Sequence, residues 1–444
     1  MLTCTKLSYE QQQIKDLFVA GENVFISGAA GTGKTHLIRH LIEISNSKEP
    51  ELVVTATTGC AATLICNQAR TINSWSGIGI ATEQNDIIVE KISRNRNYRK
   101  AWKRCKVLFV DEISMLSKRI FDLLDSVGKK LRGNERPFGG IQLVFTGDFF
   151  QLPPVPDNAA KDSGSFCFKS ENWVKTFGRN QFELSINFRQ GEGVFHEMLS
   201  QIRSGKLSKQ CQEILMDRMK VQPPLDIQPI QIMPLRHKVD SINNSFNSKL
   251  ATESHSFHTF IYDCDNNTYV DEAKHKTLIK YNTVLSYHDK NSEVTLKVGS
   301  QVMCTANIDM YSDKKICNGS SGKVVRFSNN GYPVVKFVNG RTLELLPRKI
   351  NFEFMGSQYT HISMPLMLSW AITIHKAQGC SLDAALIDCG ENIFECGQAY
   401  VALSRVRSLD GLFLRSFDVS KILIKRSVLN FYASLREMNT LRMK

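Results

Sequence analysis

Short apolar runs alternate with amphipathic segments along the first half of the chain. Four runs have the length and composition typical of buried strands: Asn23–Ser27, Leu52–Thr55, Val107–Val110 and Ile141–Thr146. Two segments between or after them place apolar residues at helical spacing: His36–Ser45 and Ser117–Leu131. Buried strands separated by helices are typical of a parallel sheet covered by helices. The pattern therefore predicts an α/β fold.

The pattern becomes β-rich between residues 294 and 354. Four short strands are expected there: Gln301–Cys304, Gly322–Phe327, Pro333–Val338 and Arg341–Leu346. Asn318-Gly319 and Asn339-Gly340 are typical hairpin turns. We expect a small antiparallel barrel or sandwich inserted into a larger domain. Helix and strand mixtures return at Leu366–His375, Ala384–Asp388 and Ala399–Ser404. The Pro-rich stretch Val221–Pro234 is expected to be a connection or an insertion rather than core.

Composition narrows the class of protein. A chain of 444 residues is long enough for roughly three domains, and 42% hydrophobic with 22% charged residues is ordinary for a soluble globular protein. No apolar run approaches a membrane span, and Glu10, Lys15 and Asp16 interrupt any signal-peptide core. The twelve cysteines lack C-x-x-C spacing, so we expect reduced intracellular thiols rather than zinc ligands. The sequence does not indicate the cellular compartment.

The net charge of +13 favours a polyanionic partner. The densest basic segment, Lys91–Lys106, holds eight lysines and arginines and no acidic residue, with Tyr98 and Trp102 among them. Two interpretations remain open, a solvated basic helix face and a direct nucleic-acid contact.

Residues 28–35, Gly-Ala-Ala-Gly-Thr-Gly-Lys-Thr, fill every position of the phosphate-binding P-loop between a predicted strand and a predicted helix. In that setting backbone N–H groups point at phosphate oxygens near a helix N-terminus. Lys34 is expected to reach the outer phosphates, and the Thr35 hydroxyl is expected to bind Mg²⁺. The protein is therefore expected to handle a nucleoside triphosphate.

The strand Val107–Val110 ends in two carboxylates, Asp111 and Glu112. After a P-loop this arrangement indicates a Mg²⁺-orienting aspartate and a glutamate that polarises the attacking water.

The segment Gly147–Val155 follows the fourth strand. Gln151 is expected to sense the γ-phosphate, and Phe149 or Phe150 could face a base, although a packing role for one of them is the stronger expectation. Arg189 and Arg405 lie near expected domain boundaries, where each could stabilise the transferring phosphoryl group or form an ordinary surface ion pair.

These residues resemble the PIF-type DNA helicases, in the superfamily-one branch related to RecD, from about Leu7 to Leu435. Leu7–Gln11 resembles the adenine-sensing Q motif, and Val54–Ala62 resembles the first DNA-contact motif. The longest match is Asp111–Val155, which contains Asp-Glu-Ile-Ser-Met-Leu, Pro-Phe-Gly-Gly and Gly-Asp-Phe-Phe-Gln-Leu-Pro-Pro-Val. Further on, Ser369–Gly379 resembles the fifth helicase motif and Gly397–Arg405 the sixth.

The resemblance implies roles residue by residue. Catalytic roles fall on Lys34, Asp111, Glu112, Gln151, Arg189 and Arg405, the last as arginine finger. Nucleotide contacts fall on Gln11, Gly28, Ala29, Ala30, Gly31, Thr32, Gly33, Lys34, Thr35, Gln378 and Gly379. DNA contacts fall on Thr57, Thr58, Asn73, Ser74, Trp75, Phe149, His375 and Lys376. Magnesium would be held through Thr35 and Asp111, and Trp75 and Phe149 are the expected base-stacking residues.

The implied architecture has two RecA-like P-loop domains with an inserted Src-homology-three-like β-barrel. The expected bounds are 1–190 for the first RecA-like domain, with a wedge insertion around 75–100, then 191–290 with 360–444 for the second, and 291–359 for the barrel. Asn73 and Trp75 depart from the family's usual His and Phe, which leaves the details of that DNA contact open.

The expected activity is ATP-dependent and Mg²⁺-dependent unwinding of DNA, driven by closure of the cleft between the RecA-like domains. The 5′-to-3′ direction of movement along DNA is implied only by the family resemblance. The expected partners are single-stranded DNA, duplexes with single-stranded tails, and replication or repair proteins, with no membrane and a monomeric motor. The expected processes are DNA replication, repair and recombination. Two other classes of protein explain fewer of the predicted site residues. A single-domain P-loop switch or kinase has no use for Gln378-Gly379 and Arg405, and a nucleic-acid clamp with a decayed ATP site is expected to lack one of the ATP-site residues. Preferred DNA structure and oligomeric state are not indicated.

Overall fold

The computed structural model describes residues 7–442 apart from 46–50, 59–60, 63–64, 66–68, 80, 159, 187–192, 224–228, 282–292, 307, 310–311, 313, 315, 317–318, 355–356 and 381. The chain divides into two compact units. Unit 1 comprises Met1–Pro234 and Ile374–Lys444, and unit 2 comprises Leu235–Thr373.

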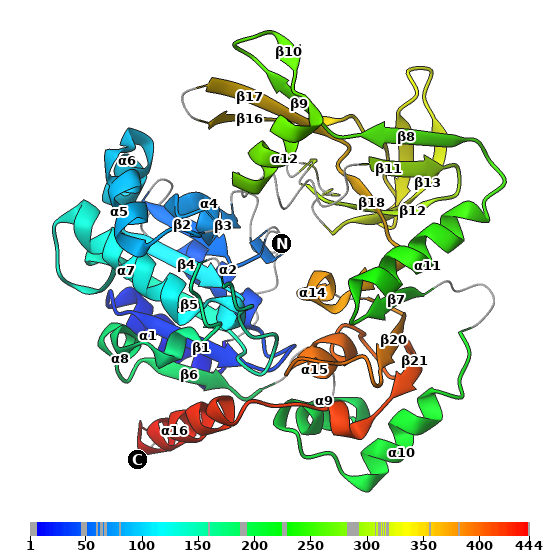
Figure 1. Cartoon of the computed structure of the whole chain (residues 1–444). Coiled ribbons are helices and arrows are strands. Elements are labelled where there is room, and N and C mark those ends of the chain that lie inside the picture. Colours follow the sequence, from blue (N-terminus) through cyan, green and yellow to red (C-terminus); the bar gives the residue numbers. More distant parts are fainter. Residues whose placement is uncertain are drawn as a thin grey trace. The chain divides into compact units, whose positions relative to one another are not determined.

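A six-stranded parallel sheet forms the centre of the first part of unit 1 (Figure 1). Its strands are β1 (Val24–Gly28), β2 (Leu52–Ala56), β3 (Arg70–Thr71), β4 (Val107–Asp111), β5 (Gln142–Gly147) and β6 (Gln181–Leu184). Their order is β3-β2-β4-β5-β1-β6, and every neighbouring pair is parallel. All five residues of β1, β2 and β4 are buried, as expected for strands covered on both faces. The four strands predicted from the apolar runs are confirmed.

Helices cover this sheet. They are α1 (Tyr9–Val19), α2 (Lys34–Ile44), α4 (Ile72–Ser76), α5 (Asn85–Arg94), α6 (Arg96–Arg104), α7 (Lys118–Arg132) and α8 (Glu171–Phe177), with short 3-10 turns η1 (Ile113–Met115), η2 (Pro137–Gly139) and η3 (Cys167–Lys169). Of the face predicted from helical spacing, Leu124, Val127 and Leu131 of α7 are buried, whereas Ile120 is only partly buried and the neighbouring Phe121 is buried instead. On the other side Leu37 and Leu41 of α2 pack with Val24 and Ile26 of β1.

The remainder of unit 1 forms a second parallel ladder, in which β20 pairs with β7 and with β21. Its elements are α9 (Val194–Ser204), α10 (Lys209–Arg218), β7 (Ile230–Met233), α14 (Ile374–Ala377), β20 (Ala385–Cys389), α15 (Gln398–Leu403), β21 (Leu412–Phe417), η4 (Val419–Lys421) and α16 (Arg426–Arg442). The expectation that Val221–Pro234 is only a connection is wrong for its second half, because Ile232 and Met233 of β7 are fully buried. The prolines misled the prediction, since those of the described residues lie outside the strand.

Unit 2 is mostly antiparallel. Its elements are α11 (Arg236–Ser248), β8 (Ser254–His258), β9 (Phe260–Asp263), β10 (Thr268–Tyr269), α12 (Glu272–Tyr281), β11 (Glu293–Lys297), β12 (Gln301–Cys304), β13 (Ser321–Phe327), β14 (Pro333–Phe337), β15 (Thr342–Glu344), β16 (Arg348–Phe354), β17 (Ser357–Ser363), β18 (Leu366–Leu368) and β19 (Ala371–Thr373). One sheet has the order β15-β14-β13-β12-β18 and another the order β10-β9-β17-β16. The four predicted strands are therefore present, while their closure into a barrel stays a prediction, and Asn318 of the predicted turn lies outside the described residues.

No helix in the described part of the chain is both long enough and apolar enough to cross a lipid bilayer.

Candidate active site

The P-loop follows the buried strand β1 and ends where α2 begins. Gly31 and Gly33 adopt φ values of 90° and 81°, a left-handed conformation that glycine adopts without steric cost. Gly28 is required for another reason, since a Cβ there would lie 2.5 Å from Thr32 Oγ1. The Thr32 hydroxyl donates to the Ala29 carbonyl at 2.9 Å and closes the loop. The predicted strand, loop and helix are therefore present in the order that phosphate binding requires.

Lys34 is the cation of this loop. Its Nζ donates to the carbonyls of Gly28 at 2.7 Å and of Ala29 at 2.9 Å. Burial lowers the pKa of Lys34, and the carboxylates of Asp148, Glu112 and Asp111 oppose that shift in decreasing order. An ammonium group that has lost solvent gains strongly from an added anion. This lysine is therefore prepared to bind phosphate oxygens.

Asp111 ends β4. Its Oδ1 accepts hydrogen bonds from the Thr146 hydroxyl and, at 2.8 Å, from the backbone N–H of Glu112. Burial raises the pKa of Asp111, although both hydrogen bonds and the charge of Lys34 favour the ionised form. A desolvated carboxyl of this kind is stabilised by a nearby cation.

Glu112 has a left-handed backbone conformation, with φ 55° and ψ 41°. A non-glycine residue there costs about 1–3 kcal/mol and persists only where its surroundings hold it. Gly147 of β5 leaves the necessary space, because a Cβ at that position would lie 2.8 Å from Ile113 N. Burial raises the pKa of Glu112 and the charge of Asp111 raises it further, while Lys34 and Arg405 act against this. Backbone strain and a raised carboxyl pKa are typical of a residue held for catalysis.

Gln378 contacts two other predicted site residues, Glu112 and Gln151. Its Nε2 donates to Glu112 Oε2 at 3.1 Å, and it lies 3.4 Å from both Ser114 Oγ and Gln151 Oε1. Its Oε1 is buried and has no hydrogen-bond partner within the described residues. Gly379, with φ 83°, turns the chain directly after it. The structure therefore brings Glu112, Gln151 and Gln378 together, with one amide acceptor left for a further donor.

Arg405 lies at the end of α15 and is buried. Its guanidinium donates to the carbonyls of Val401 at 2.7 Å and Cys380 at 3.2 Å, and to Ser404 Oγ at 2.8 Å. Its charge is near enough to lower the pKa of Glu112 against the larger effect of burial. The other predicted arginine, Arg189, lies outside the described residues.

A second group of buried charges lies beside the P-loop and was not predicted from the sequence. We call it the paired cluster: Asp148, Glu183, Arg203 and Tyr432. Arg203 donates twice to Asp148, at 2.9 Å from both Nε and Nη2, and once to Glu183 at 2.9 Å. The Tyr432 hydroxyl donates to Asp148 Oδ1 at 3.1 Å.

This paired cluster also reaches the P-loop strand. The Tyr432 hydroxyl hydrogen-bonds with Ser27 Oγ at 2.5 Å and accepts the Phe149 N–H at 3.1 Å. Burial alone would lower the pKa of Arg203, but Asp148 more than offsets this and the pKa is raised. A signal existed in the sequence, because Arg203 interrupts the apolar face of α9 formed by Met198, Leu199 and Ile202.

A cavity of about 390 Å³ opens beside the P-loop within unit 1. Its walls come from α1, the P-loop, β6, α9 and α16, through Gln13, Ala29, Leu184, Leu199 and Asn439 among others. Asn439 Oδ1 is buried and has no hydrogen-bond partner in the described part of the chain. Gln11, the predicted adenine contact, is 2% exposed, and its Oε1 accepts the Ser8 N–H at 3.1 Å in a capping box. Its role in base recognition stays a prediction.

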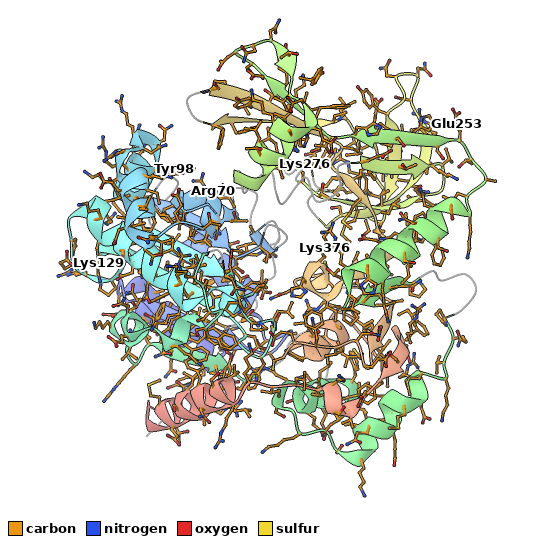
Figure 2. The ribbon with its side chains drawn as sticks, in the orientation of Figure 1. Arg70, Tyr98, Lys129, Glu253, Lys276 and Lys376 are labelled. Carbon is orange, nitrogen blue, oxygen red and sulfur yellow. The ribbon has the colours of Figure 1, made fainter. Side chains whose placement is uncertain are left out.

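The predicted DNA contacts fall into two groups. Thr57, Thr58, Asn73 and Ser74 are not fully buried, and Lys376, labelled in Figure 2, lies with His375 on α14. Asn73 Nδ2 donates to the Gly79 carbonyl at 2.8 Å. These positions stay predicted DNA contacts.

Trp75 and Phe149 form the second group and need correction. Each is 1% exposed, so neither offers a ring face to a base. Trp75 packs on Trp102 of α6 at 4.6 Å between ring centroids, and Phe149 lies among aromatic rings that include Phe168 at 4.8 Å and Phe431 at 5.3 Å. Burial of large aromatic surface explains both positions, and the base-stacking role expected for them is not supported.

Comparison with known proteins agrees with this geometry. The family model of PIF1-like helicases matches residues 6–213. The ATP-dependent DNA helicase PIF1 of Xenopus laevis is 34% identical over 441 residues, which cover 98% of this chain and 66% of the Xenopus protein. The chain thus spans slightly less than two thirds of that relative.

Two solved structures are similar over nearly the whole chain. The crystal structure of Pif1 helicase from Candida albicans has a TM-score of 0.84 and 32% identity, and covers 97% of this chain and 99% of that one. Pif1 helicase from Bacteroides in complex with ADP-AlF3 and single-stranded DNA has a TM-score of 0.75 and 27% identity, with 98% of both chains covered. The family resemblance inferred from the sequence motifs is confirmed, and the chain belongs to the PIF1-like helicases.

Proposed function

We propose that this protein is an ATP-dependent DNA helicase, which hydrolyses ATP at the P-loop site, moves along single-stranded DNA and displaces the paired strand. The observation that carries the proposal is the cluster of Lys34, Asp111, Glu112 and Gln378. It combines a desolvated cation for phosphate with a strained glutamate for water activation. The names of the relatives, and the DNA and ADP-AlF3 bound to the Bacteroides protein, support the same activity.

In this proposal each residue has one task. Lys34 and the P-loop N–H groups hold the β- and γ-phosphates, and Glu112 accepts a proton from the attacking water. Arg405 exchanges carbonyl partners for the γ-phosphate and stabilises charge that develops there. Arg189 is proposed as a second such arginine, by resemblance. Gln151 and Gln378, 3.4 Å apart, report whether the phosphate is present.

Magnesium fits this site. The predicted ligands, the Asp111 carboxylate and the Thr35 hydroxyl, are hard oxygen donors, and the raised pKa of Asp111 shows a carboxyl that an added cation would stabilise. In the described part of the chain no group of three or more His, Cys, Asp or Glu side chains is arranged to hold a metal. Magnesium, however, needs only one or two protein ligands when phosphates supply others. Bound there, it would neutralise charge on the phosphates.

The cavity of about 390 Å³ beside the P-loop is the proposed place of the nucleoside. The unpartnered Asn439 Oδ1 is an acceptor, which suits the exocyclic amino group of adenine.

By family resemblance, we propose that two RecA-like domains close on ATP and that a Src-homology-three-like subdomain is inserted in the chain. The proposed movement along DNA is 5′ to 3′, also by resemblance. Closure follows if ATP gains contacts, such as those of Arg405, only in one arrangement. Replication, repair or recombination are the proposed settings for such a motor.

A strand-displacement assay tests the function and its direction together. Duplexes carry a single-stranded tail at the 5′ end or at the 3′ end, and displacement is followed with and without ATP and Mg²⁺. We expect displacement only of the 5′-tailed duplex and only with ATP. Displacement of the 3′-tailed duplex alone would contradict the direction, while ATP hydrolysis unaffected by DNA and without displacement would favour a nucleotide switch.

A further inference from the structure

Thr57 directly follows β2, whose last residue Ala56 is paired with Asp111 of β4. Its backbone N–H donates to the Asp111 carbonyl at 3.1 Å, and its hydroxyl donates to the Glu112 carbonyl at 2.7 Å. The predicted DNA-contact segment is therefore bonded to the backbone of both catalytic carboxylates.

The Thr57 hydroxyl is one of three contacts that hold Glu112. The N–H of Glu112 donates to Asp111 Oδ1 at 2.8 Å, and its carboxylate accepts Gln378 Nε2 at 3.1 Å. The left-handed backbone conformation of Glu112 is strained and persists only while its surroundings hold it. The conformation therefore depends on each of these contacts. In the arrangement held by Thr57, one carboxylate oxygen is engaged with an amide instead of being open to water.

A phosphate at Thr57 competes with this arrangement. A threonine hydroxyl has one proton to donate, and phosphodiester oxygens only accept. The hydroxyl can donate to the Glu112 carbonyl or to a phosphate, but not to both at once. The Thr57 N–H offers no substitute, since the Asp111 carbonyl already accepts it.

We propose that Thr57 is a positioning residue for Glu112, and that its hydroxyl proton alternates between the Glu112 carbonyl and a phosphate of single-stranded DNA. Capture of DNA releases the Glu112 backbone, and the carboxylate leaves Gln378 and turns to the attacking water. The inference rests on the proposed helicase function and gives that function a physical link between DNA binding and ATP hydrolysis.

The test compares Thr57→Val, which keeps the shape but has no hydroxyl proton, with Thr57→Ser, which keeps the proton. The steady-state rate of ATP hydrolysis is measured over a range of ATP, without DNA and with saturating oligothymidylate. In Thr57→Val we expect the DNA-free kcat to rise and the ratio of stimulated to DNA-free kcat to fall at least about fivefold, with KM for ATP within about twofold of wild type. Thr57→Ser is expected to keep the ratio.

Thr55→Val is the matched control. The Thr55 hydroxyl donates to the Phe109 carbonyl at 2.7 Å, which is the same bond between the same two strands, away from the carboxylates. The control is expected to keep the wild-type ratio. An unchanged ratio in Thr57→Val, or an equal fall in Thr55→Val or Thr57→Ser, would overturn the inference while leaving the proposed function intact. A wild type that DNA does not stimulate would contradict both.

Discussion

Unit 1 buries charge in two neighbouring places, and they differ in how that charge is compensated. In the paired cluster each charged group has an oppositely charged partner: Asp148 receives two N–H bonds from Arg203 and one O–H bond from Tyr432. In the catalytic cluster, which comprises Lys34, Asp111, Glu112 and Gln378, the hydrogen bonds that Lys34 makes to described residues go to neutral carbonyls. Glu112 is strained, and Gln378 Oε1 has no partner among the described residues.

Under the proposed function, we interpret the paired cluster as a structural site and the other cluster as the site of the chemistry. A buried network whose charges are paired is expected to hold the fold around it in one arrangement, and here Glu183 and Arg203 also line the cavity proposed for the nucleoside. In the catalytic cluster, burial lowers the pKa of Lys34 and raises the pKa values of Asp111 and Glu112, so the charged forms of these side chains are disfavoured. Under the proposed function, bound phosphate and metal would stabilise those charges. Substitutions in the paired cluster should therefore reduce stability, and those in the catalytic cluster should reduce activity.

The largest effect is expected from Arg203→Met. It leaves Asp148 buried with its charge unpaired, which costs about 3–5 kcal/mol of unfolding free energy. Chemical denaturation with the variant and wild type measures this loss. Arg436→Met is the matched control, because Arg436 also binds Glu183, at 2.7 Å, but from an exposed position worth about 0–1 kcal/mol. Equal losses in the two variants would contradict the distinction.

Lys34→Ala is expected to separate activity from stability. Removing a cation that acts on developing charge lowers kcat for ATP hydrolysis by about 10²–10³, or roughly 3–4 kcal/mol of barrier. The free energy of unfolding should fall much less than in Arg203→Met, since burial disfavours the lost ammonium group and this offsets the loss of its two carbonyl hydrogen bonds. Hydrolysis and denaturation are measured on the same preparations. A stable variant with full hydrolysis would show that the phosphate assignment is wrong.

Tyr432→Phe is expected to have an intermediate effect. The ring remains, but Asp148, Ser27 and the Phe149 N–H each lose a hydrogen-bond partner. We expect a loss of about 1–3 kcal/mol in unfolding free energy, with KM for ATP nearly unchanged. A variant as stable as wild type would mean that α16 does not need this contact.

The smallest effect is expected from Asp111→Asn in the protein without nucleotide. Because burial raises the pKa of Asp111 in the folded state, the unfolded chain releases this proton at lower pH, and the wild type loses stability as pH rises out of the ordinary aspartate range. The asparagine variant has no such loss. Its unfolding free energy relative to wild type should therefore grow from pH 3 upward, as measured by denaturation across that range. A difference independent of pH would contradict the raised pKa.

The sequence predicted the catalytic cluster because its parts are local. Gly28–Thr35 and Asp111-Glu112 each follow a short apolar strand, and parallel strands place their carboxyl ends at one edge of the sheet. The fold class followed from the same strands. The contacts that complete the cluster needed three dimensions, since 266 residues separate Gln378 from Glu112 and 55 residues separate Thr57 from Glu112.

The paired cluster and the aromatic residues could not be predicted in the same way. Tyr432 and Asp148 are 284 residues apart, and no local pattern relates them. Trp75 was expected to stack on bases by family resemblance and Phe149 by its place at the C-terminal edge of the sheet, but burial against Trp102 and Phe431 is decided by tertiary packing. Aromatic residues in a motif indicate apolar surface, not whether that surface faces a ligand or the core.

The most direct test of the catalytic cluster is the DNA-stimulated ATPase rate of Glu112→Gln beside its affinity for ATP. The substitution keeps the size of the side chain and removes its capacity to take a proton. We predict that ATP binds as in wild type while kcat falls by about 10²–10⁴. Hydrolysis at the wild-type rate would contradict the claim that this cluster does the chemistry.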